Sequence, residues 1–379
     1  MTARVVIIGA DSAGLAAAAA LQSRGIDAII VEQGPDVAMS WRSRHDRLHL
    51  NTTRRTSGLR ELRIPREAGR WVSRDGYIAY LERFSARQRI QIRFNTTVHA
   101  VDRAEDGWQI ATNTGILPAS DVVVATGLDR VGWIPDWIGR SGFARPIVHV
   151  ADLRHAADLS GQHVLLAGAG NSGVDIAAHL LDAGVARLWV SVRTPPNIVP
   201  AEIHRVPLQA VALAARPLPE RLRDAIARLA SRYAFGDLRR FGLPTPADGP
   251  YRRLRTTGVT IAVDQGFVAG LKAGRVHPVA EIHYLDGTDV VLSDGTRLQP
   301  DTLLAATGYR TGLQTVVGHL GVLDEHGLPR LPVQRTSPTP GMHFIGFRPA
   351  IEGNLRQHPI EARRIAREIG RRHRHVGRT

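Results

Sequence analysis

Two segments of this chain share one pattern, in which an apolar run leads into a glycine-rich loop and then into a stretch rich in alanine and leucine. The first is RVVIIGADSAGLAAAAALQSRG, residues 4–25, and the second is HVLLAGAGNSGVDIAAHLLDAG, residues 163–184. Each is followed by another apolar run, DAIIVEQ (27–33) or RLWVSV (187–192). Continuous apolar runs of this kind are typical of buried parallel strands. Each segment therefore predicts a strand–helix–strand unit.

Each unit is followed by a passage that repeats in the same order. Residues 98–127 and residues 279–308 both contain alternating apolar and polar runs, glycine-containing turns, and a final apolar run that ends in Ala-Thr-Gly. An Asp-Gly pair between alternating runs is typical of a β-hairpin, because glycine adopts positive φ without steric cost. This repetition predicts an α/β protein with two Rossmann-like, dinucleotide-binding domains of common ancestry.

The two glycine loops differ at their middle position. Gly168, Gly170 and Gly173 make the second loop an intact GxGxxG, whereas the first loop, GADSAG, has Asp11 in place of the middle glycine. In such loops the first glycine permits the tight turn, the second lets the backbone approach a pyrophosphate, and the third lets the helix pack against the strand. The strand before and the helix after each loop are the context that the motif requires. We therefore expect one dinucleotide at each loop.

The residues after each second apolar run indicate which dinucleotide binds. Glu32 lies about 20 residues beyond the first loop, where an acid accepts a hydrogen bond from a ribose hydroxyl, and this favours an adenosine with a free 2′-OH, such as that of FAD. The second unit has Arg193 and Thr194 at the corresponding place and no acid. An arginine there suits a 2′-phosphate, and hence NADP(H). Two such sites in one chain predict a flavin that is reduced by a nicotinamide.

The composition argues against several other classes of protein. The 379 residues include no cysteine, which rules out disulfides, thiolate metal sites and a cysteine-based redox relay. The net charge is +14, but the arginines are spread along the chain and only 5% of the residues are aromatic, so no nucleic-acid partner is expected. No apolar stretch reaches the ~18 residues of a membrane span. With no signal peptide in view, we expect a cytoplasmic protein without stable membrane insertion.

Residues 195–250 lie between the second glycine unit and the second hairpin passage and resemble neither. An apolar stripe recurs there at helical spacing, formed by Leu218, Leu222, Ile226, Leu229 and Tyr233. Arginines on the opposite face make a membrane-surface helix one interpretation. Packing of the stripe onto a neighbouring domain is the favoured one, with this segment as a lid or a linker.

Further motifs, taken in order, resemble the class B flavin-containing monooxygenases, and in particular compact bacterial members related to the plant auxin-forming enzymes. They are SWRSRHDRLHLNTTRRTSGL (40–59), DGYIAYLERF (75–84), GQHVLLAGAGNSGVDIA (161–177), VRTPPNIVP (192–200), AATGYRTGL (305–313) and GFRPAIEGNLRQHPIEARRIA (346–366). The resemblance covers nearly the whole chain. It implies a FAD-binding domain at 1–150 and 300–379, interrupted by an NADPH-binding domain at 151–299 with a helical insertion at about 195–250. Disulfide reductases share this architecture but need a redox cysteine pair.

The resemblance also implies roles for individual residues. Asn51 would lie against the isoalloxazine ring as the catalytic residue that helps to hold the oxygenated flavin, with a turn-forming asparagine as the alternative. The residues implied to bind FAD are Gly9, Ala10, Asp11, Ser12, Gly14, Glu32, Trp41, Arg42, Thr126 and Gly127. Those implied to bind NADPH are Gly168, Gly170, Asn171, Ser172, Gly173, Arg193 and Thr194, and the two implied to lie near both cofactors are Thr307 and Gly308.

The activity implied by the resemblance is that of an NADPH-dependent flavin monooxygenase. NADPH would reduce FAD, O2 would add to the flavin at C4a, and one oxygen atom would enter a small organic substrate by N- or S-oxygenation or a Baeyer–Villiger type of reaction. The flavin supplies this chemistry, so no Ser-His-Asp set is expected. No metal is expected either, because the sixteen histidines show no HExxH or similar ligand spacing. A homo-oligomer is left open.

Two segments depart from the family pattern. In FARPIVHVADL (143–153) the Phe and the His are kept, but Arg145 replaces a glycine and Leu153 an aromatic residue. In GFRPAIEG, Arg348 and Glu352 introduce charges near the expected flavin face. Both departures bear on oxygenation more than on the fold.

Asp11 is a third departure, because it brings a carboxylate to a phosphate-binding loop. Two like charges ~4 Å apart repel by roughly 4 kcal/mol at an effective dielectric near 20. FAD still binds if the side chain points away and leaves its backbone N–H for the phosphate, or if an arginine such as Arg42 neutralises it. Otherwise FAD binding is weak. The alternatives to a monooxygenase are a flavin-dependent NADPH oxidase or reductase without oxygen insertion, and a diverged nucleotide-binding pseudoenzyme.

Overall fold

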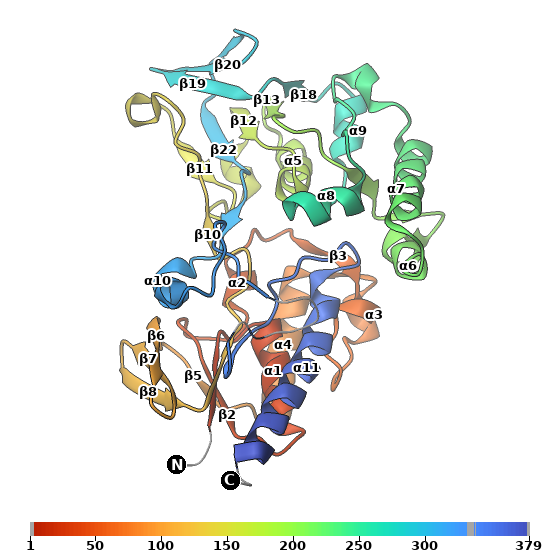
Figure 1. Ribbon diagram of the computed structural model, residues 1–379. Coiled ribbons are helices and arrows are strands. Elements are labelled where there is room, and N and C mark those ends of the chain that lie inside the picture. The colour runs from red at the N-terminus through yellow and green to blue at the C-terminus, as the bar shows by residue number, and fades with distance from the viewer. Residues whose placement is uncertain (1–3, 332–336, 338, 377–379) are drawn as a thin grey trace.

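Figure 1 shows the computed structural model, which describes residues 4–331, 337 and 339–376. It is an α/β fold with two five-stranded parallel sheets, and the parts built on them are here called the first-sheet unit and the second-sheet unit. The first sheet has the order β24-β9-β1-β2-β5, with bounds Met342–Phe344, Asp121–Val124, Val5–Ile8, Ala28–Val31 and Ile92–Arg93. The second has the order β11-β22-β12-β13-β18, with bounds Ile147–His149, Thr302–Ala305, His163–Ala167, Arg187–Ser191 and Val276–Val279.

The first-sheet unit forms around the first predicted strand–helix–strand unit. β1 is buried throughout and pairs in parallel with β2 and β9. The helix α1 (Ser12–Gln22) follows the glycine loop, and nearly all of its residues are buried. Its alanines leave room for α11 (Asn354–Val376) to lie along it (Figure 1), where Ala362 and Ile365 join the same apolar core.

The second-sheet unit repeats this arrangement with α5 (Asn171–Ala183) after β12. Its sheet also includes β11, which precedes residue 150, and β22, which follows residue 300. The pairing of the second sheet thus extends one strand beyond each of the boundaries expected from the sequence. The chain passes from the first sheet to the second before β11 and returns to the first sheet after β22.

The two hairpin passages form two three-stranded antiparallel sheets, as their Asp-Gly turns predicted. The first contains β6, β7 and β8, and the second contains β19, β20 and β21. Gly107 (φ +134°) and Gly287 (φ +58°) lie at turns of these sheets and have the positive φ that favours glycine. The bounds are Val98–Ala104, Gly107–Thr112 and Gly115–Ala119 for the first sheet, and Ile282–Asp286, Asp289–Leu292 and Arg297–Leu298 for the second.

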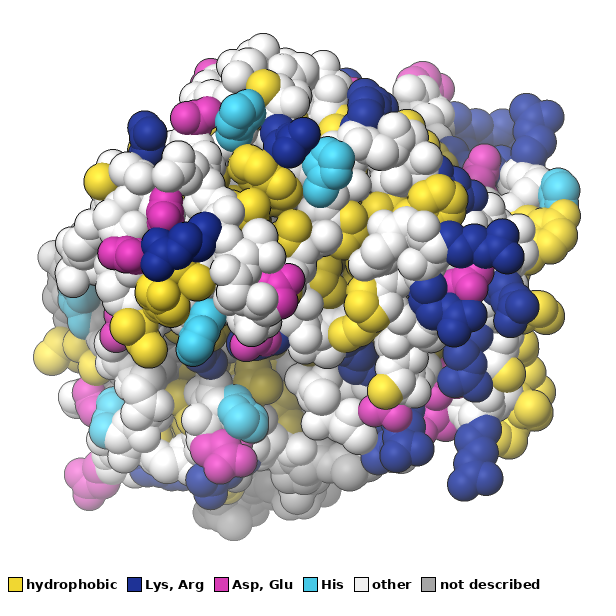
Figure 2. Space-filling view, turned by 90° about the horizontal axis from the view of Figure 1, so that it is seen from above, with side chains coloured by type: hydrophobic (Ala, Val, Ile, Leu, Met, Phe, Trp, Pro, Cys, Tyr) yellow, Lys and Arg dark blue, Asp and Glu magenta, His cyan; other side chains and the backbone are white. Residues whose placement is uncertain are grey.

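The insertion carries the helices α6, α7 and α8 on one side of the second-sheet unit (Figure 1), with bounds Leu208–Ala214, Glu220–Phe235 and Pro250–Thr257. The prediction that its apolar stripe packs onto a neighbouring domain is wrong for most of α7, since Leu222, Leu229 and Tyr233 are 51%, 70% and 65% exposed. Ile226, another member of the stripe, does line the cavity, together with its neighbour Ala227. Figure 2 shows apolar side chains among many basic side chains along this edge of the molecule, and the basic residues of the insertion are all arginines.

The other helices and strands are short, apart from α4, which has 15 residues. They are α2 (Met39–Arg42), β3 (His49–Thr53), α3 (Arg54–Ser57), β4 (Trp71–Ser73), α4 (Arg74–Gln88), β10 (Val131–Gly132), β14 (Ile198–Pro200), β15 (Glu202–Ile203), β16 (Val206–Pro207), β17 (Ala262–Asp264), α9 (Phe267–Lys272), β23 (Tyr309–Arg310) and α10 (Gln314–Val317). Among the described residues, no helix has both the length and the apolar character needed to cross a bilayer.

Candidate functional site

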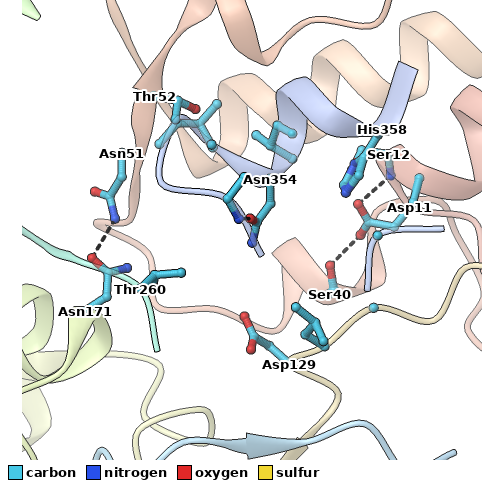
Figure 3. Close-up of a pocket in the computed structure, with 18 of the residues that line it drawn as sticks. Asp11, Ser12, Ser40, Asn51, Thr52, Asp129, Asn171, Thr260, Asn354 and His358 are labelled. Atoms are coloured by element: carbon cyan, nitrogen blue, oxygen red, sulfur yellow. Dashed lines mark hydrogen bonds between the residues drawn. The ribbon is translucent and has the colours of Figure 1, made fainter. Parts of the chain in front are cut away.

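The two glycine units meet at one cavity of about 720 Å³. The N-terminal end of α1 and the N-terminal end of α5 both contribute to its wall, and Figure 3 shows Asp11, Ser12, Asn51 and Asn171 around it. The residues predicted from the sequence that line the cavity are Gly9, Ala10, Asp11, Ser12, Glu32, Trp41, Asn51, Thr126, Gly127, Asn171 and Ser172. The fold therefore brings residues from both units to a single site.

The first glycine loop has the geometry that its motif predicts. Gly9 has φ +107°, and a Cβ added there would lie 3.0 Å from the carbonyl oxygen of Ala125. A Cβ on Gly14 would lie 1.9 Å from the carbonyl oxygen of Gly9. Gly9 is thus required by the turn, and Gly14 by the packing of α1 on the loop. Because the first N–H groups of a helix lack carbonyl partners within it, the start of α1 can receive an anion.

The second glycine loop repeats this backbone. Gly168 has φ +106°, and a Cβ on it would lie 2.6 Å from the carbonyl oxygen of Ala306. A Cβ on Gly173 would lie 2.1 Å from the carbonyl oxygen of Gly168. At Gly170, by contrast, no described atom lies within 4 Å of an added Cβ, and the backbone is extended (φ −72°, ψ −170°). The space beside Gly170 is therefore open to a ligand.

The carboxylate of Asp11 is held by three donors that carry no charge. Its Oδ1 accepts hydrogen bonds from the backbone N–H of Ser12 (2.6 Å) and from Trp41 Nε1 (3.0 Å), and its Oδ2 accepts one from the Ser40 hydroxyl. Figure 3 shows the side chain reaching toward Ser40. Ser40 and Trp41 both lie on α2, which begins after Ala38 in the left-handed region (φ +60°). The side chain is thus drawn toward α2.

The prediction that Arg42 neutralises Asp11 is wrong. The Arg42 guanidinium pairs with Asp36 (3.1 Å) and with Glu82, and its Nε donates to the carbonyl oxygen of Val37. Trp41 and Arg42 are adjacent on one short helix and therefore point in different directions. Only Trp41 reaches the loop and the cavity.

Glu32 lies at the end of β2, is 7% exposed, and borders the cavity. Its two carboxylate oxygens accept the backbone N–H groups of Ala10 (2.8 Å) and Gly34 (2.9 Å). Burial raises the pKa of Glu32 even though these two hydrogen bonds act in the opposite direction. Each carboxylate oxygen has a further lone pair, so Glu32 can still accept a hydroxyl.

Asn51 joins the two units across the cavity. Its Nδ2 donates to Oδ1 of Asn171 at 3.1 Å, and its Oδ1 accepts from Nε2 of Gln265 at 2.8 Å (Figure 3). Asn171 is the first residue of α5 and also accepts the backbone N–H of Val263. Asn51 lies within the strand β3 and contacts the second glycine loop directly, so the alternative of a turn-forming asparagine is wrong.

Two buried polar groups beside the first loop carry further information. The Oγ1 atom of Thr126 is buried in the cavity wall and has no hydrogen-bond partner among the described residues. A buried unpaired hydroxyl costs about 1–3 kcal/mol, so this atom points to a missing ligand. On α11, Nδ1 of His358 lies 2.9 Å from the Ser12 hydroxyl. Burial lowers the pKa of His358 to about 4, which keeps the ring neutral near pH 7.

Several predicted residues lie outside the main cavity: Gly14, Arg42, Gly168, Gly170, Gly173, Arg193, Thr194, Thr307 and Gly308. Gly170 and Thr194 line a separate small pocket of about 20 Å³ together with Arg253. Arg193 is exposed just beyond the carboxyl end of β13. The cofactor-binding roles of these residues stay predictions.

Thr307 and Gly308 hold the chain where it leaves the second sheet. The Thr307 hydroxyl donates to the carbonyl oxygen of Trp133, and the Gly308 carbonyl oxygen accepts the backbone N–H of Trp133 at 3.0 Å. Nε2 of His149 lies 3.0 Å from the same Gly308 oxygen. These contacts describe a structural junction between β11 and β22.

Four of the residues that depart from the family pattern do not line the cavity, whereas Asp11 does. Arg145 is exposed, and Leu153 is buried in the core of the second-sheet unit. Arg348 and Glu352 do not line the cavity either, whereas the neighbouring Ile351 does. Burial and then the negative charge of Glu352 raise the pKa of Tyr251, a residue of the cavity wall, so Glu352 acts on the cavity even though its side chain does not line it.

Sequence reasoning assigned no residues to two parts of the site, although it expected residues 195–250 to contribute to the pocket. The apolar wall opposite Asn51 comes from the insertion, and its residues include Val199, Leu208, Val211, Ala212, Ala215, Ile226, Ala227 and Tyr251. The other part is a buried group of His45, Asp175 and His179, which the sequence analysis passed over when it expected no metal. The Asp-x-x-x-His spacing within α5 was the available signal, because residues four apart share a helix face.

Comparisons with known proteins agree with this architecture. Residues 6–197 match the family described as pyridine nucleotide-disulphide oxidoreductase. The chain is 32% identical to indole-3-pyruvate monooxygenase YUCCA1 of Oryza sativa subsp. japonica over 90% of this chain and 86% of that protein. It is 30% identical to the probable indole-3-pyruvate monooxygenase YUCCA1 of Arabidopsis thaliana, over 96% and 89%. The flavin-containing monooxygenase of Stenotrophomonas maltophilia shares the fold, with a TM-score of 0.73, 19% identity and 98% of each chain covered.

Proposed function

This chain belongs to the class B flavin monooxygenases, among the pyridine nucleotide-disulphide oxidoreductases, and we propose that its main cavity holds FAD at the first glycine loop and NADPH at the second. The observation that carries this proposal is that the N-termini of α1 and α5 open onto one cavity. Helix N-termini and their preceding loops favour phosphates. The first-sheet unit is then the FAD-binding domain, and the second-sheet unit is the NADPH-binding domain.

The first loop fits FAD. Gly9 lets the backbone turn tightly, and Glu32 has lone pairs left for a ribose hydroxyl. Thr126, whose buried hydroxyl has no hydrogen-bond partner among the described residues, belongs to the cavity wall. The chemistry that FAD supplies when bound is hydride uptake from NADPH and activation of O2. Trp41 packs edge-on against Tyr77, with ring centroids 4.8 Å apart, and this fixes the indole at the cavity wall.

The second loop fits the pyrophosphate of NADPH. Gly170 faces open space, and Asn171 and Ser172 begin α5 at the cavity. Arg193, exposed at the carboxyl end of β13, lies where the 2′-phosphate of a dinucleotide is expected in this type of fold. Asn51 then lies beside the place where the two cofactors approach each other, and its role is to orient them.

The substrate pocket that we propose is the apolar wall from the insertion. This wall excludes water, which the chemistry at the flavin requires. The Arg223 guanidinium lies 4.3 Å from the centroid of the Tyr251 ring, and its buried Nε has no hydrogen-bond partner in the described part of the chain. A small aromatic 2-oxo acid, of the type named for the relatives, would place its ring on the apolar wall and its carboxylate near Arg223.

The decisive experiment combines flavin content with isotope labelling. We expect the purified protein to bind FAD, to oxidise NADPH faster when indole-3-pyruvate is added, and to place one ¹⁸O atom from ¹⁸O2 in the organic product. Failure to take up FAD present in large excess would overturn the proposal. Oxidation of NADPH that yields only H2O2 and no labelled product would identify an oxidase instead.

The substrate assignment has its own test. Arg223→Met should raise the KM for indole-3-pyruvate by about 10–100-fold, because a hydrogen bond to a charged group contributes about 1.5–3 kcal/mol. Arg221→Met is the matched control, since Arg221 is exposed on the same helix. An equal KM in both variants would remove Arg223 from the substrate pocket and leave the cofactor assignment untouched.

A further inference from the structure

A buried cluster of two histidines and one aspartate lies where the two units meet. His45 comes from the segment between α2 and β3 in the first-sheet unit, whereas Asp175 and His179 lie one turn apart on α5 in the second-sheet unit. Their exposed fractions are 8%, 5% and 8%. His45 and Asp175 also line the main cavity. Neither the proposed cofactor sites nor the proposed substrate pocket uses this cluster.

The distances within the cluster are short, but the hydrogen bonding is incomplete. Nε2 of His45 lies 3.0 Å from Oδ2 of Asp175, and Nε2 of His179 lies 3.6 Å from the other carboxylate oxygen. Neither ring nitrogen of His179 has a hydrogen-bond partner among the described residues, and the same holds for Oδ1 of Asp175. Buried polar groups are rarely left in this state unless an ion or a water completes them. The cluster therefore lacks a component.

The electrostatics suit a cation. The carboxylate and both imidazoles are buried, so water and salt screen their interaction with a cation only weakly. The group thus presents one carboxylate and two imidazoles, the donor types that zinc and similar first-row transition metals prefer. The arrangement of Asp175 and His179, four residues apart on one helix face, is the one that helix-borne zinc motifs use.

We propose that His45, Asp175 and His179 bind a divalent transition-metal ion such as Zn²⁺ and that this ion ties the two units together. One ligand atom from each residue lies within 4.8 Å of the others. In a tetrahedral zinc site, with metal–ligand distances of about 2.0–2.1 Å, the ligand atoms are about 3.3 Å apart, so small side-chain rotations complete the site. The fourth position faces the cavity, because two of the three ligands line it.

A metal ion at this cluster would strengthen a contact between the two units. The segment around His45 also contacts the second-sheet unit through exposed ion pairs, Arg47 with Asp182 and Asp46 with His155, and through two hydrogen bonds made by Arg154. Exposed ion pairs contribute little to stability. A metal ion with ligands from both units would hold the segment that follows α2 against α5. We therefore expect Zn²⁺ to stabilise the relative position of the two units.

The test is equilibrium dialysis of the purified holoprotein against buffered Zn²⁺, followed by metal analysis. We expect the wild-type protein to retain one equivalent of zinc. Asp175→Asn and His45→Asn should each weaken binding by more than about 100-fold, because removal of even an outer-shell partner costs 10–100-fold. His155→Asn is the matched control, since His155 lies at the same junction but outside the cluster, and it should bind zinc like the wild type.

Two further measurements make the outcome decisive. Zinc should raise the temperature of thermal unfolding in the wild type and in His155→Asn but in neither ligand variant. If a ligand variant does not fold, X-ray absorption spectroscopy of the wild-type protein must still report two imidazole ligands on the bound zinc. Zinc that is not retained, or that binds the wild type and Asp175→Asn equally well, would overturn the proposal and leave the cluster as a hydrogen-bonded contact.

Discussion

The first and the second glycine loop have nearly the same backbone but present different charges. Gly9 and Gly168 have φ of +107° and +106°. At the middle position, however, the first loop has Asp11, whose carboxylate receives three hydrogen bonds, and the second has Gly170 beside open space. The same turn therefore accepts either residue, and the difference lies in what surrounds it.

The comparison teaches that a phosphate-binding loop tolerates a carboxylate when a neighbouring element supplies donors. For the first loop this element is α2, whose Ser40 and Trp41 reach Asp11. After β13 the chain forms no helix before β14, and Thr194 and Pro196 lie beside Gly170 instead. A carboxylate in the second loop would thus lack the donors of α2, and the polar side chains nearest to it would be those of Thr194, Arg253 and Thr260, which line the small pocket beside Gly170.

The largest effect is expected when the first loop's residue is copied into the second. Gly170→Asp should weaken NADPH binding by about 1,000-fold, because a carboxylate ~4 Å from a phosphate costs roughly 4 kcal/mol at an effective dielectric near 20. FAD binding should not change. The measurement is the NADPH dissociation constant from calorimetry. Gly170→Asn has nearly the same shape without the charge, and equal losses in both variants would show that bulk, not charge, is what the loop excludes.

The second-largest effect is expected at the last glycine of each loop, Gly14 or Gly173, which both loops have. Gly14→Ala and Gly173→Ala should each lower the free energy of unfolding by about 3 kcal/mol, because the new methyl group would overlap a backbone carbonyl oxygen at 1.9 or 2.1 Å. Gly170→Ala is the control and should change stability by less than about 0.5 kcal/mol. Denaturant unfolding monitored by circular dichroism gives all three values. A stable Gly173→Ala protein would mean that α5 can move away from its loop.

The sequence was sufficient to predict both strand–helix–strand units and both hairpin passages. Apolar runs, glycine loops and Asp-Gly turns are local signals, because each determines the backbone conformation of the same residues that form the pattern. The expected roles of Gly9 and Gly14 follow from this local geometry. Asn51 and Asn171, both named from the sequence, line the cavity, although their direct hydrogen bond across the two units was not foreseen.

Contacts between distant segments could not be predicted in this way. Whether Asp11 is balanced by Arg42 or by Ser40 depends on the direction in which a four-residue helix presents its side chains, and the sequence pattern does not contain that direction. The cluster of His45 and His179 joins residues that only the packing of the two units brings together. The apolar residues of α7 recur at helical spacing, but this spacing does not determine which face of the helix packs against the rest of the protein.

A third, smaller effect is a pH dependence of stability that involves the first loop. His358 contacts Ser12, at the start of α1 beside this loop, and burial lowers the pKa of His358 to about 4. The unfolded chain, in which a histidine titrates near 6.5, binds more protons between pH 6.5 and 4, so stability falls as the pH falls through this window. Between pH 7.5 and 5.5 the loss is about 1.3 kcal/mol. His358→Asn should remove this part of the pH dependence of unfolding, and an unchanged profile would contradict the assignment.

The smallest effect tests how well the first loop has compensated for its charge. Asp11→Asn keeps the shape, and the amide oxygen can still accept from Ser12 and Trp41. At ~8 Å and an effective dielectric near 40 the carboxylate repels a phosphate charge by roughly 1 kcal/mol, so the variant should bind FAD about fivefold more tightly in a fluorescence titration. Asp36→Asn, which removes a half-exposed carboxylate paired with Arg42, should leave the affinity unchanged. If Asp11→Asn also leaves it unchanged, then the donors of α2 balance the carboxylate fully, and the two loops are electrostatically equivalent despite their sequences.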